Sequence, residues 1–527
     1  MLAEAAPRRT YALIAAITLL VAAVMLCLDG AVDGDVYLQL ASGRFIAEHG
    51  LVGTDPFPTI AHGSPWLNQQ WLTELTFYGV SRVVGITGLT VVYALLLGAP
   101  LALLLWMCRR KGTMMMIALA VLYAPGAWMV LHPRAAGLTM LAFSALVVLI
   151  VAAWLTSSPA SRAQGRARWV PVGVLLLFAL WANLHGGFVG GLLLIGLVVS
   201  GLALDRWRAH PAAVSSRQLV ALVLIGVLAV VTVTLATPLG TEIWSYMLSF
   251  RNPAIAQISS EWEPAFQRPR AVVYLMLASA FVLWLWWRSP SPRAITPFLV
   301  STGFLGFAAV SVRNLVFVTP AIALQIACSA PARDRPRPRA VVALAAAGTL
   351  FAGLIWVGTL GPARNARPLG SPLVRYAVSH PPREGRIASS APVGSYMLWR
   401  SPRTPVVLDG WLEHFSPSEL RGTYSLLDGR SAHPTRNLRR LRIGAAIANR
   451  RAAIRVLRRH GFVRVFSTGD GSYLVRRGAW PLPAQGHRDL VQGGPARSQH
   501  GTGGRAKLRR HESFRRVRLV TGRRGGP

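Results

Sequence analysis

The sequence contains few charged residues and almost no cysteine. Only 14% of its 527 residues are Asp, Glu, Lys or Arg, whereas 53% are hydrophobic and the mean hydropathy is +0.42. Soluble proteins need a more ionic surface, so a soluble enzyme and a disordered regulator are excluded. The three cysteines, Cys27, Cys108 and Cys328, lie far apart in or beside apolar runs. This spacing excludes a disulfide framework and leaves a zinc site without enough ligands.

Several sequence patterns are also missing. We find no internal repeat and no GxGxxG or P-loop signature, so cytosolic nucleotide chemistry has no visible phosphate-binding loop. A transporter is disfavoured because two-fold repeats and paired interrupted helices are absent from the pattern.

Long apolar runs are abundant instead. Those between residues 11 and 359 are long enough to cross ~30 Å of hydrocarbon. We predict an α-helical polytopic membrane protein with about 11 transmembrane helices, near 11–28, 85–107, 114–131, 135–156, 169–182, 186–204, 217–236, 271–287, 295–310, 314–329 and 339–359. The first run is long for a signal peptide and no A-x-A site follows it, so we expect it to be retained.

The distribution of basic residues predicts the orientation. With a cytoplasmic N-terminus, the inner connections contain 17 Lys and Arg residues, and the outer ones up to residue 360 contain seven. The positive-inside rule therefore predicts a plasma-membrane protein with its N-terminus inside and its C-terminal part outside. Nine of the twelve acidic residues before residue 361 fall on the outer side. Longer outer loops would explain this bias as well as a functional site would.

The composition changes after residue 360. Residues 361–480 contain 21 Lys and Arg against 6 Asp and Glu, and residues 481–527 contain 11 against 2. We predict an extracytoplasmic α/β domain over 361–480, with strands at 386–390, 405–408, 444–448, 463–467 and 472–475 and helices at 418–427 and 451–461. Residues 481–527 have the composition of a disordered basic tail. Because these basic regions are predicted outside, we expect lipid phosphate as their partner and no nucleic acid.

The first outer loop, residues 29–84, contains a pair of carboxylates, Asp33 and Asp35, at the start of a predicted surface helix. Capping of the helix N-terminus would explain the pair without any chemistry. Alternatively, the pair positions a general base or a divalent cation. The sequence alone does not decide whether Asp33 and Asp35 bind a metal ion.

Further polar residues occur at the outer ends of the predicted spans. They are Asp55, Trp66, Gln70, Glu74, His132, Arg134, Asn183, His185, Glu261, Arg313 and Asn314. Ionisable groups near hydrocarbon usually pair or line a cavity, so the set predicts one polar pocket at the outer face. Taken singly, Trp66 is equally typical of an interfacial belt and His185 of a packed histidine.

The order of these residues resembles the GT-C superfamily of multi-spanning glycosyltransferases. The similarity is closest to a bacterial group with D-x-D…DPF…PW…W-L-x-E in the first outer loop. The matching residues are Asp33-x-Asp35, Asp55-Pro56-Phe57, Pro65-Trp66, Trp71-Leu72-x-Glu74, Trp181-x-Asn183-x-His185, Glu261-Trp262, Arg313-Asn314, Gly394-Ser395-Tyr396 and Leu408-Asp409-Gly410. The resemblance covers most of residues 10–480 and makes residues 1–360 a GT-C-like transmembrane domain.

The resemblance implies transfer of a sugar from a polyprenyl-phosphate donor to an envelope glycan or protein acceptor, with inversion. It implies that an acidic residue of the first outer loop activates the acceptor, for which Asp35 is our choice, with Asp33 as its partner. Arg134 and Arg313 would bind phosphate. Two positions depart from the pattern, since Gln39 replaces an expected histidine and Trp411 an arginine. The alternative is a non-enzymatic envelope scaffold or lipid-binding protein of the same fold.

The predicted orientation can be tested by cysteine labelling. A Ser467→Cys variant should react with a membrane-impermeant maleimide in intact cells, because residues 361–527 are predicted outside. Labelling only after permeabilisation would reverse the orientation.

Overall fold

The computed structural model describes residues 34–127, 130–155, 169–210, 214–249, 255, 258–259, 261–330 and 369–479. The predicted spans 11–28 and 339–359, Asp33 and the predicted tail 481–527 lie outside these residues. The chain divides into two compact units. The first comprises Met1–Pro56, His62–Ala366 and Gly410–Pro417, and the second comprises Phe57–Ala61, Arg367–Asp409 and Ser418–Pro527.

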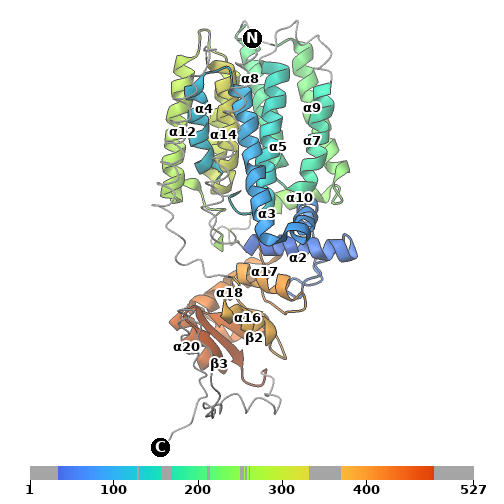
Figure 1. Cartoon of the computed structure of the whole chain (residues 1–527), viewed down its shortest axis with the longest axis vertical. Helices are drawn as coiled ribbons and strands as arrows, with labels where there is room; N and C mark the ends of the chain where they lie inside the picture. The colour runs from blue at the N-terminus through green and yellow to red at the C-terminus, as the bar shows by residue number, and fades with distance from the viewer. Residues whose placement is uncertain are drawn as a thin grey trace, which may run out of the picture. The chain divides into compact units, whose positions relative to one another are not determined.

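The first unit is a helical bundle. Its helices are α2 (Gly34–His49), α3 (Trp71–Cys108), α4 (Thr113–Gly126), α5 (Ala135–Ile150) with the π-helical turn η2 (Val151–Leu155), α7 (Val170–Leu184), α8 (Phe188–Trp207), α9 (Ser216–Ala236), α10 (Glu242–Ser249), η4 (Ala265–Gln267), α12 (Pro269–Arg288), α13 (Ile295–Val310), η5 (Val312–Phe317) and α14 (Val318–Ser329). Figure 1 shows the long helices side by side, with α2 lying crosswise at one end of them.

Among the described residues, six helices are long and apolar enough to cross a membrane, and three shorter helices are also apolar. All nine predicted spans between residues 85 and 329 coincide with helices. The prediction of a multi-pass α-helical membrane protein is thus confirmed, while the count of eleven stays a prediction. The helix at the second predicted span begins earlier than expected, at Trp71, and is interrupted at Gly85, which has a φ of 73°.

The crosswise helix α2 packs closely on the start of α3. Its apolar side chains Val36 and Leu40 are completely buried. The closest approach is at Gly43, where a Cβ atom would overlap the backbone carbonyl of Glu74 and the Cβ of Tyr78. Only glycine allows the two helices to lie this close, and this contact positions the N-terminal part of α2.

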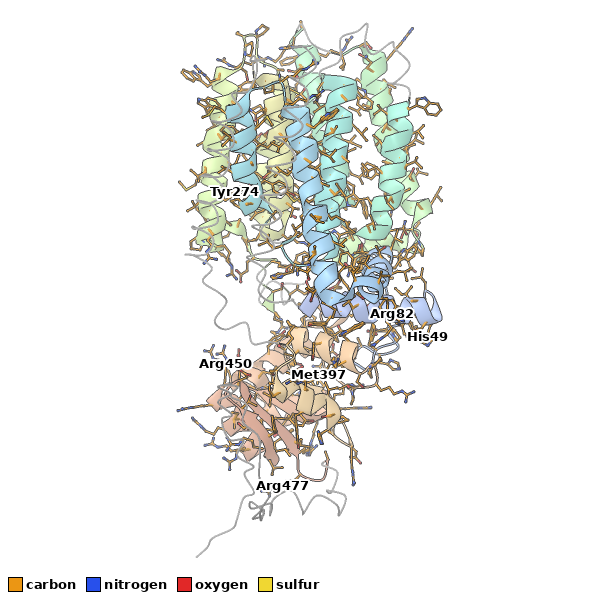
Figure 2. All side chains as sticks on the ribbon, in the orientation of Figure 1. His49, Arg82, Tyr274, Met397, Arg450 and Arg477 are labelled. Carbon is orange, nitrogen blue, oxygen red and sulfur yellow. The ribbon has the colours of Figure 1, made fainter. Side chains whose placement is uncertain are left out.

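The second unit contains a four-stranded sheet in the order β1-β2-β4-β3. Strand β1 (Arg386–Ala388) is parallel to β2 (Ile443–Ala448), and β4 (Gly471–Arg476) is antiparallel to both β2 and β3 (Phe462–Thr468). The helices are α16 (Pro372–Ser379), α17 (Ala391–Arg400), α18 (Pro417–Asp428), α19 (Pro434–Arg440) and α20 (Arg451–Arg459). The predicted α/β character is confirmed, and exposed arginines such as Arg450 and Arg477 project from this unit (Figure 2).

Of the five predicted strands, the second, 405–408, is wrong as a full strand. Val406 forms only an isolated parallel bridge with Ile387. The backbone of this segment instead forms hydrogen bonds with part of the first outer loop. The Ile60 amide donates to the Val407 carbonyl, and the Val406 amide donates to the Pro58 carbonyl.

The two units exchange short segments. Phe57–Ala61 of the first outer loop belongs to the sheet unit, and Gly410–Pro417 belongs to the helical unit. The predicted domain boundary between residues 360 and 361 does not include this exchange of segments. The helical unit therefore includes side chains encoded far beyond its last described helix.

The α2–α3 contact predicts a difference between two glycine substitutions. Gly43→Ala should lower the free energy of unfolding by about 1–3 kcal/mol, because the added methyl group overlaps backbone atoms. Gly79→Ala in α3 is the matched control, since a Cβ there meets no atom within 4 Å. Thermal unfolding in detergent, followed by tryptophan fluorescence, measures both. Equal melting temperatures for the two variants would contradict the close packing.

Candidate active site

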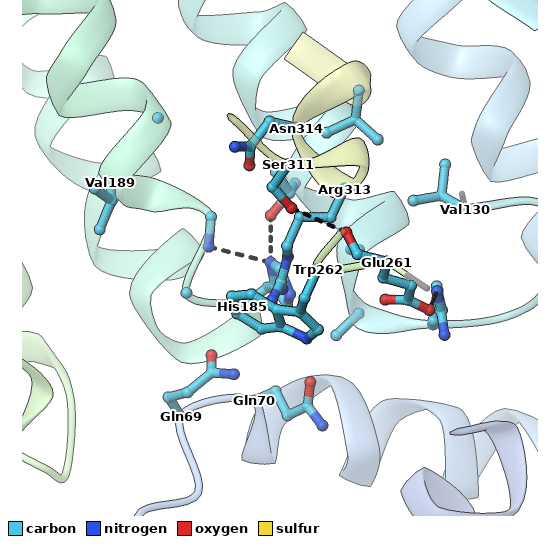
Figure 3. Close-up of a pocket in the computed structure, with 18 of the residues that line it drawn as sticks. Gln69, Gln70, Val130, His185, Val189, Glu261, Trp262, Ser311, Arg313 and Asn314 are labelled. Atoms are coloured by element: carbon cyan, nitrogen blue, oxygen red, sulfur yellow. Dashed lines mark hydrogen bonds and ion pairs between the residues drawn. The ribbon is translucent and has the colours of Figure 1, made fainter. Parts of the chain in front are cut away.

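A cavity of about 560 Å³ lies within the helical unit, a volume suited to a small ligand (Figure 3). Seven predicted site residues line it: Asp35, Gln70, Arg134, His185, Glu261, Arg313 and Asn314. They come from α2, the residue before α3, and the connections that precede α5, α8, α12 and α14. The cavity thus brings together chain segments that are far apart in the sequence.

An ion-pair cluster forms one side of the cavity. Arg134 is the N-cap residue of α5, and its guanidinium pairs with Asp35 and, at 2.5 Å, with Glu261. The arginine side chain is only 9% exposed, whereas those of Asp35 and Glu261 are 39% and 28% exposed. Arg134 therefore joins three separate elements, and its charge is engaged by two carboxylates.

An adjoining part of the cavity wall is built around Arg313. Its guanidinium stacks over the Trp262 ring at 4.0 Å from the centroid, a cation–π contact. Its backbone amide and the Ser311 hydroxyl both donate to the Glu261 carbonyl, at 3.1 and 2.9 Å. These bonds tie the segment around Glu261 to the start of η5, so that both arginines face one cavity.

His185 also lines the cavity and lies directly after α7. Its Nδ1 accepts a hydrogen bond from the Gly187 amide (3.1 Å) and lies 2.8 Å from the Thr139 hydroxyl. Burial lowers the pKa of His185 to about 3, with smaller contributions from the positive charges of Arg313 and Arg134. The imidazole is therefore neutral at physiological pH.

The segment Gly410–Pro417 contributes Gly410, Trp411 and Glu413 to the cavity wall, and none of these was among the predicted site residues. Trp411 and Glu413 line the wall, and the Tyr246 hydroxyl donates to Glu413 at 2.7 Å. Burial, followed by the charge of Glu413, raises the pKa of Tyr246 well above its ordinary value, so the hydroxyl remains a donor. His414 Nδ1 lies 3.6 Å from an Asp55 carboxylate oxygen. The sequence pointed to Trp411 only as a departure from the family pattern, and no sequence pattern pointed to Glu413 or Tyr246 as site residues.

Two glutamines also line the cavity and were not among the predicted site residues. Gln39 and Gln69 are 4% and 5% exposed, and no described residue donates a hydrogen bond to either amide oxygen. The Gln69 side chain also hydrogen-bonds the Tyr246 hydroxyl. Buried acceptors usually have donors, so these two oxygens suit the O–H or N–H groups of a ligand.

Five predicted residues do not line the cavity: Asp55, Trp66, Glu74, His132 and Asn183. Glu74 is buried and accepts hydrogen bonds from Asn68 (2.5 Å) and Gln70 (3.2 Å). Asn183 accepts from the Trp71 indole at 2.8 Å. These hydrogen bonds connect Glu74 and Asn183 to neighbouring residues of the bundle.

Trp66 packs edge-on against Phe45, with ring centroids 6.0 Å apart, and His132 is half-buried. Among the described residues, no group of three His, Cys, Asp or Glu side chains is placed to hold a metal ion. Asp35, one of the two carboxylates considered for a divalent cation, pairs with the Arg134 guanidinium.

No family model and no curated protein matches the sequence. Solved structures do match. ArnT from Cupriavidus metallidurans bound to undecaprenyl phosphate has a TM-score of 0.54 and 15% identity, with 88% of this chain and 97% of that chain covered. The Archaeoglobus fulgidus oligosaccharyltransferase tethered with an acceptor peptide has a TM-score of 0.54 and 11% identity, with 89% and 75% covered. The chain has the GT-C fold.

A second GT-C structure with a bound lipid, the archaeal oligosaccharyltransferase AglB in complex with an inhibitory peptide and a dolichol-phosphate, matches with a TM-score of 0.52 and 11% identity. The GT-C resemblance inferred from the motifs is thus confirmed for the fold. At these identities the likeness concerns architecture, and the chemistry must be argued from the cavity itself.

The buried position of His185 predicts that it does not titrate between pH 5 and 8. Its pKa in the folded protein lies below the ordinary 6.5, so the unfolded chain binds more protons between these two values. The contribution of His185 to stability is complete above about pH 6.5 and decreases as the pH falls toward 3. Solid-state NMR of ¹⁵N-histidine-labelled protein measures the titration, and subtraction of a His185→Gln spectrum assigns the signal. A midpoint near 6.5 would contradict this expectation.

Proposed function

We propose that this chain is a membrane glycosyltransferase that moves a sugar from a polyprenyl-phosphate donor to an envelope glycan or protein on the outer face of the plasma membrane. One observation carries the proposal: a single cavity in a GT-C bundle combines carboxylates, two guanidiniums and buried amide oxygens. The ArnT structure with undecaprenyl phosphate and the AglB structure with dolichol-phosphate support a lipid phosphate as the ligand class.

The reaction requires a base and a stabilised leaving group. The acceptor hydroxyl oxygen forms a bond to the anomeric carbon while the bond from that carbon to the phosphate oxygen breaks. The phosphate leaves with the electron pair, and the hydroxyl proton passes to a carboxylate. Asp35 is our candidate for this base, because it lines the cavity at the start of α2, where its carboxylate pairs with Arg134.

Arg313 and Arg134 are both candidate phosphate ligands. The Arg313 guanidinium stacks on Trp262 at the cavity wall, and the charges of Glu261 and Glu413 act on it. A guanidinium remains charged when it is buried and offers several donors to phosphate oxygens. Such donors lower the barrier most where negative charge develops on the leaving group.

The amide oxygens of Gln39 and Gln69 are candidates for contacts with the sugar. Both are acceptors without a described donor, and sugar hydroxyl groups would supply the missing hydrogen atoms. The side chain at position 39 would thus act in binding, since an amide does not titrate in place of the expected histidine.

Asp35→Asn tests the proposed base. The change preserves the shape of the side chain but removes proton acceptance and the charge that pairs with Arg134, so turnover should fall about 10²- to 10⁴-fold. Melting temperatures of the variant and the wild type show whether loss of the ion pair unfolds the protein. Glu48→Gln on the exposed end of α2 is the control and should retain turnover. The measurement is transfer from a panel of undecaprenyl-phosphate hexoses and pentoses by membranes with matched amounts of each variant.

Undiminished turnover of Asp35→Asn would remove this residue from the chemistry. Wild-type protein that binds undecaprenyl phosphate but transfers no sugar from any donor would instead support the lipid-binding alternative.

A further inference from the structure

The tautomer of His185 follows from its hydrogen bonds. A backbone amide can only donate, and the Gly187 amide lies 3.1 Å from His185 Nδ1. Nδ1 must therefore be the unprotonated nitrogen of the neutral ring. In a neutral imidazole the proton then resides on Nε2.

A second donor enforces the same tautomer. The Trp181 indole, which is completely buried, can only donate, and its nitrogen lies 2.9 Å from the Thr139 hydroxyl oxygen. That hydroxyl accepts from Trp181 and directs its own hydrogen to His185 Nδ1 at 2.8 Å. Nδ1 of His185 thus faces two donors. One is the Thr139 hydroxyl on α5, which is oriented by Trp181 of α7, and the other is the Gly187 amide directly before α8.

The glycine at position 187 is required by this network. A Cβ atom on Gly187 would overlap the hydroxyl and the methyl group of Thr139. Any other residue would therefore displace the threonine that orients the ring. Close contact with Thr139 therefore explains why the last residue of the W-x-N-x-H-G-G segment is glycine.

The other ring nitrogen is directed to a ligand position. His185 lines the cavity, and no described residue hydrogen-bonds its Nε2. The charges of Arg313 and Arg134 lie close enough to oppose protonation of the ring. The nearby carboxylates already have partners: Asp35 and Glu261 pair with Arg134, Glu413 accepts a hydrogen bond from Tyr246, and the charges of Glu261 and Glu413 also act on Arg313. A hydrogen-bond donor near two guanidiniums suits an anion.

We propose that His185, as a neutral imidazole, donates a hydrogen bond from Nε2 to a phosphate oxygen of the polyprenyl-phosphate donor, beside Arg313. This inference rests on the proposed function and deepens it, because it assigns the phosphate end of the cavity. His185 transfers no proton in this role. Thr139 and Trp181 are positioning residues that act through the ring.

Two conservative substitutions distinguish the ring nitrogens. His185→Gln can place an amide N–H near the position of Nε2, whereas the shorter His185→Asn places its amide near Nδ1. The probe is undecaprenyl phosphate in nanodiscs, with undecaprenol and inorganic phosphate as parallel probes. Loss of a hydrogen bond to a charged group should weaken binding of undecaprenyl phosphate by His185→Asn about ten- to a hundredfold. His185→Gln should stay within about threefold of the wild type, and undecaprenol binding should not change.

The positioning residues are tested by spectroscopy. In wild-type protein the ¹⁵N spectrum should show a protonated Nε2 and an unprotonated Nδ1 at His185. Thr139→Val retains the shape but removes one donor, so the proportion of the other tautomer should rise and undecaprenyl phosphate should bind more weakly. Melting temperatures confirm that each variant is folded.

The outcomes separate the two proposals. Equal affinity of His185→Asn and wild type, equal losses in His185→Asn and His185→Gln, or a protonated Nδ1 would overturn the role of His185. The same loss of affinity for inorganic phosphate and for undecaprenyl phosphate supports phosphate as the recognised group, whereas a loss confined to the lipid assigns the site to the lipid headgroup. The expected binding pattern without sugar transfer supports the role of His185 and counts against the enzymatic function.

Discussion

The site depends on one buried guanidinium, that of Arg134. A charge removed from water at the end of an apolar bundle is stable only if carboxylates and hydrogen bonds replace its hydration, and removal of one partner from such a pair typically costs about 3–5 kcal/mol. Asp35 and Glu261 meet this need, and each belongs to a different element. The crosswise helix, the start of α5 and the segment before α12 are thus held together by the electrostatic requirement of a single side chain.

Polar side chains around the cavity are linked by short chains of hydrogen bonds, and each chain leaves one or more polar atoms available to a ligand. Trp181 donates to Thr139, which donates to His185, and this leaves the second imidazole nitrogen directed to the cavity. Gln69 and Tyr246 are linked in the same way, and Tyr246 continues to Glu413. Each chain fixes a rotamer through buried donors, so the cavity is organised before any ligand enters. The amide oxygens that lack described donors are the corresponding cost in stability.

Hydropathy predicted the helices well because the length of hydrocarbon that a helix must cross leaves little freedom. The cavity residues could be predicted as a group, since alternate connections of such a bundle reach the same end. Their individual roles could not. Glu74 and Asn183 belong to the right region but turn toward neighbouring helices, and periodicity near a helix end does not determine that direction. Trp411 and Glu413 were missed because their position depends on long-range chain exchange that no local pattern encodes.

The exchange of Gly410–Pro417 into the helical unit also orders the events of biosynthesis. The other segments that line the cavity have been synthesised once the chain reaches Phe317, but Trp411 and Glu413 follow about a hundred residues later. At typical translation rates of about 5–20 residues per second this interval is on the order of ten seconds. A nascent chain that already contains its described apolar helices therefore still has an incomplete cavity wall. The polar cavity wall is complete only after β1, the first of the four strands, has been synthesised, so maturation of the site is a late, post-insertion step.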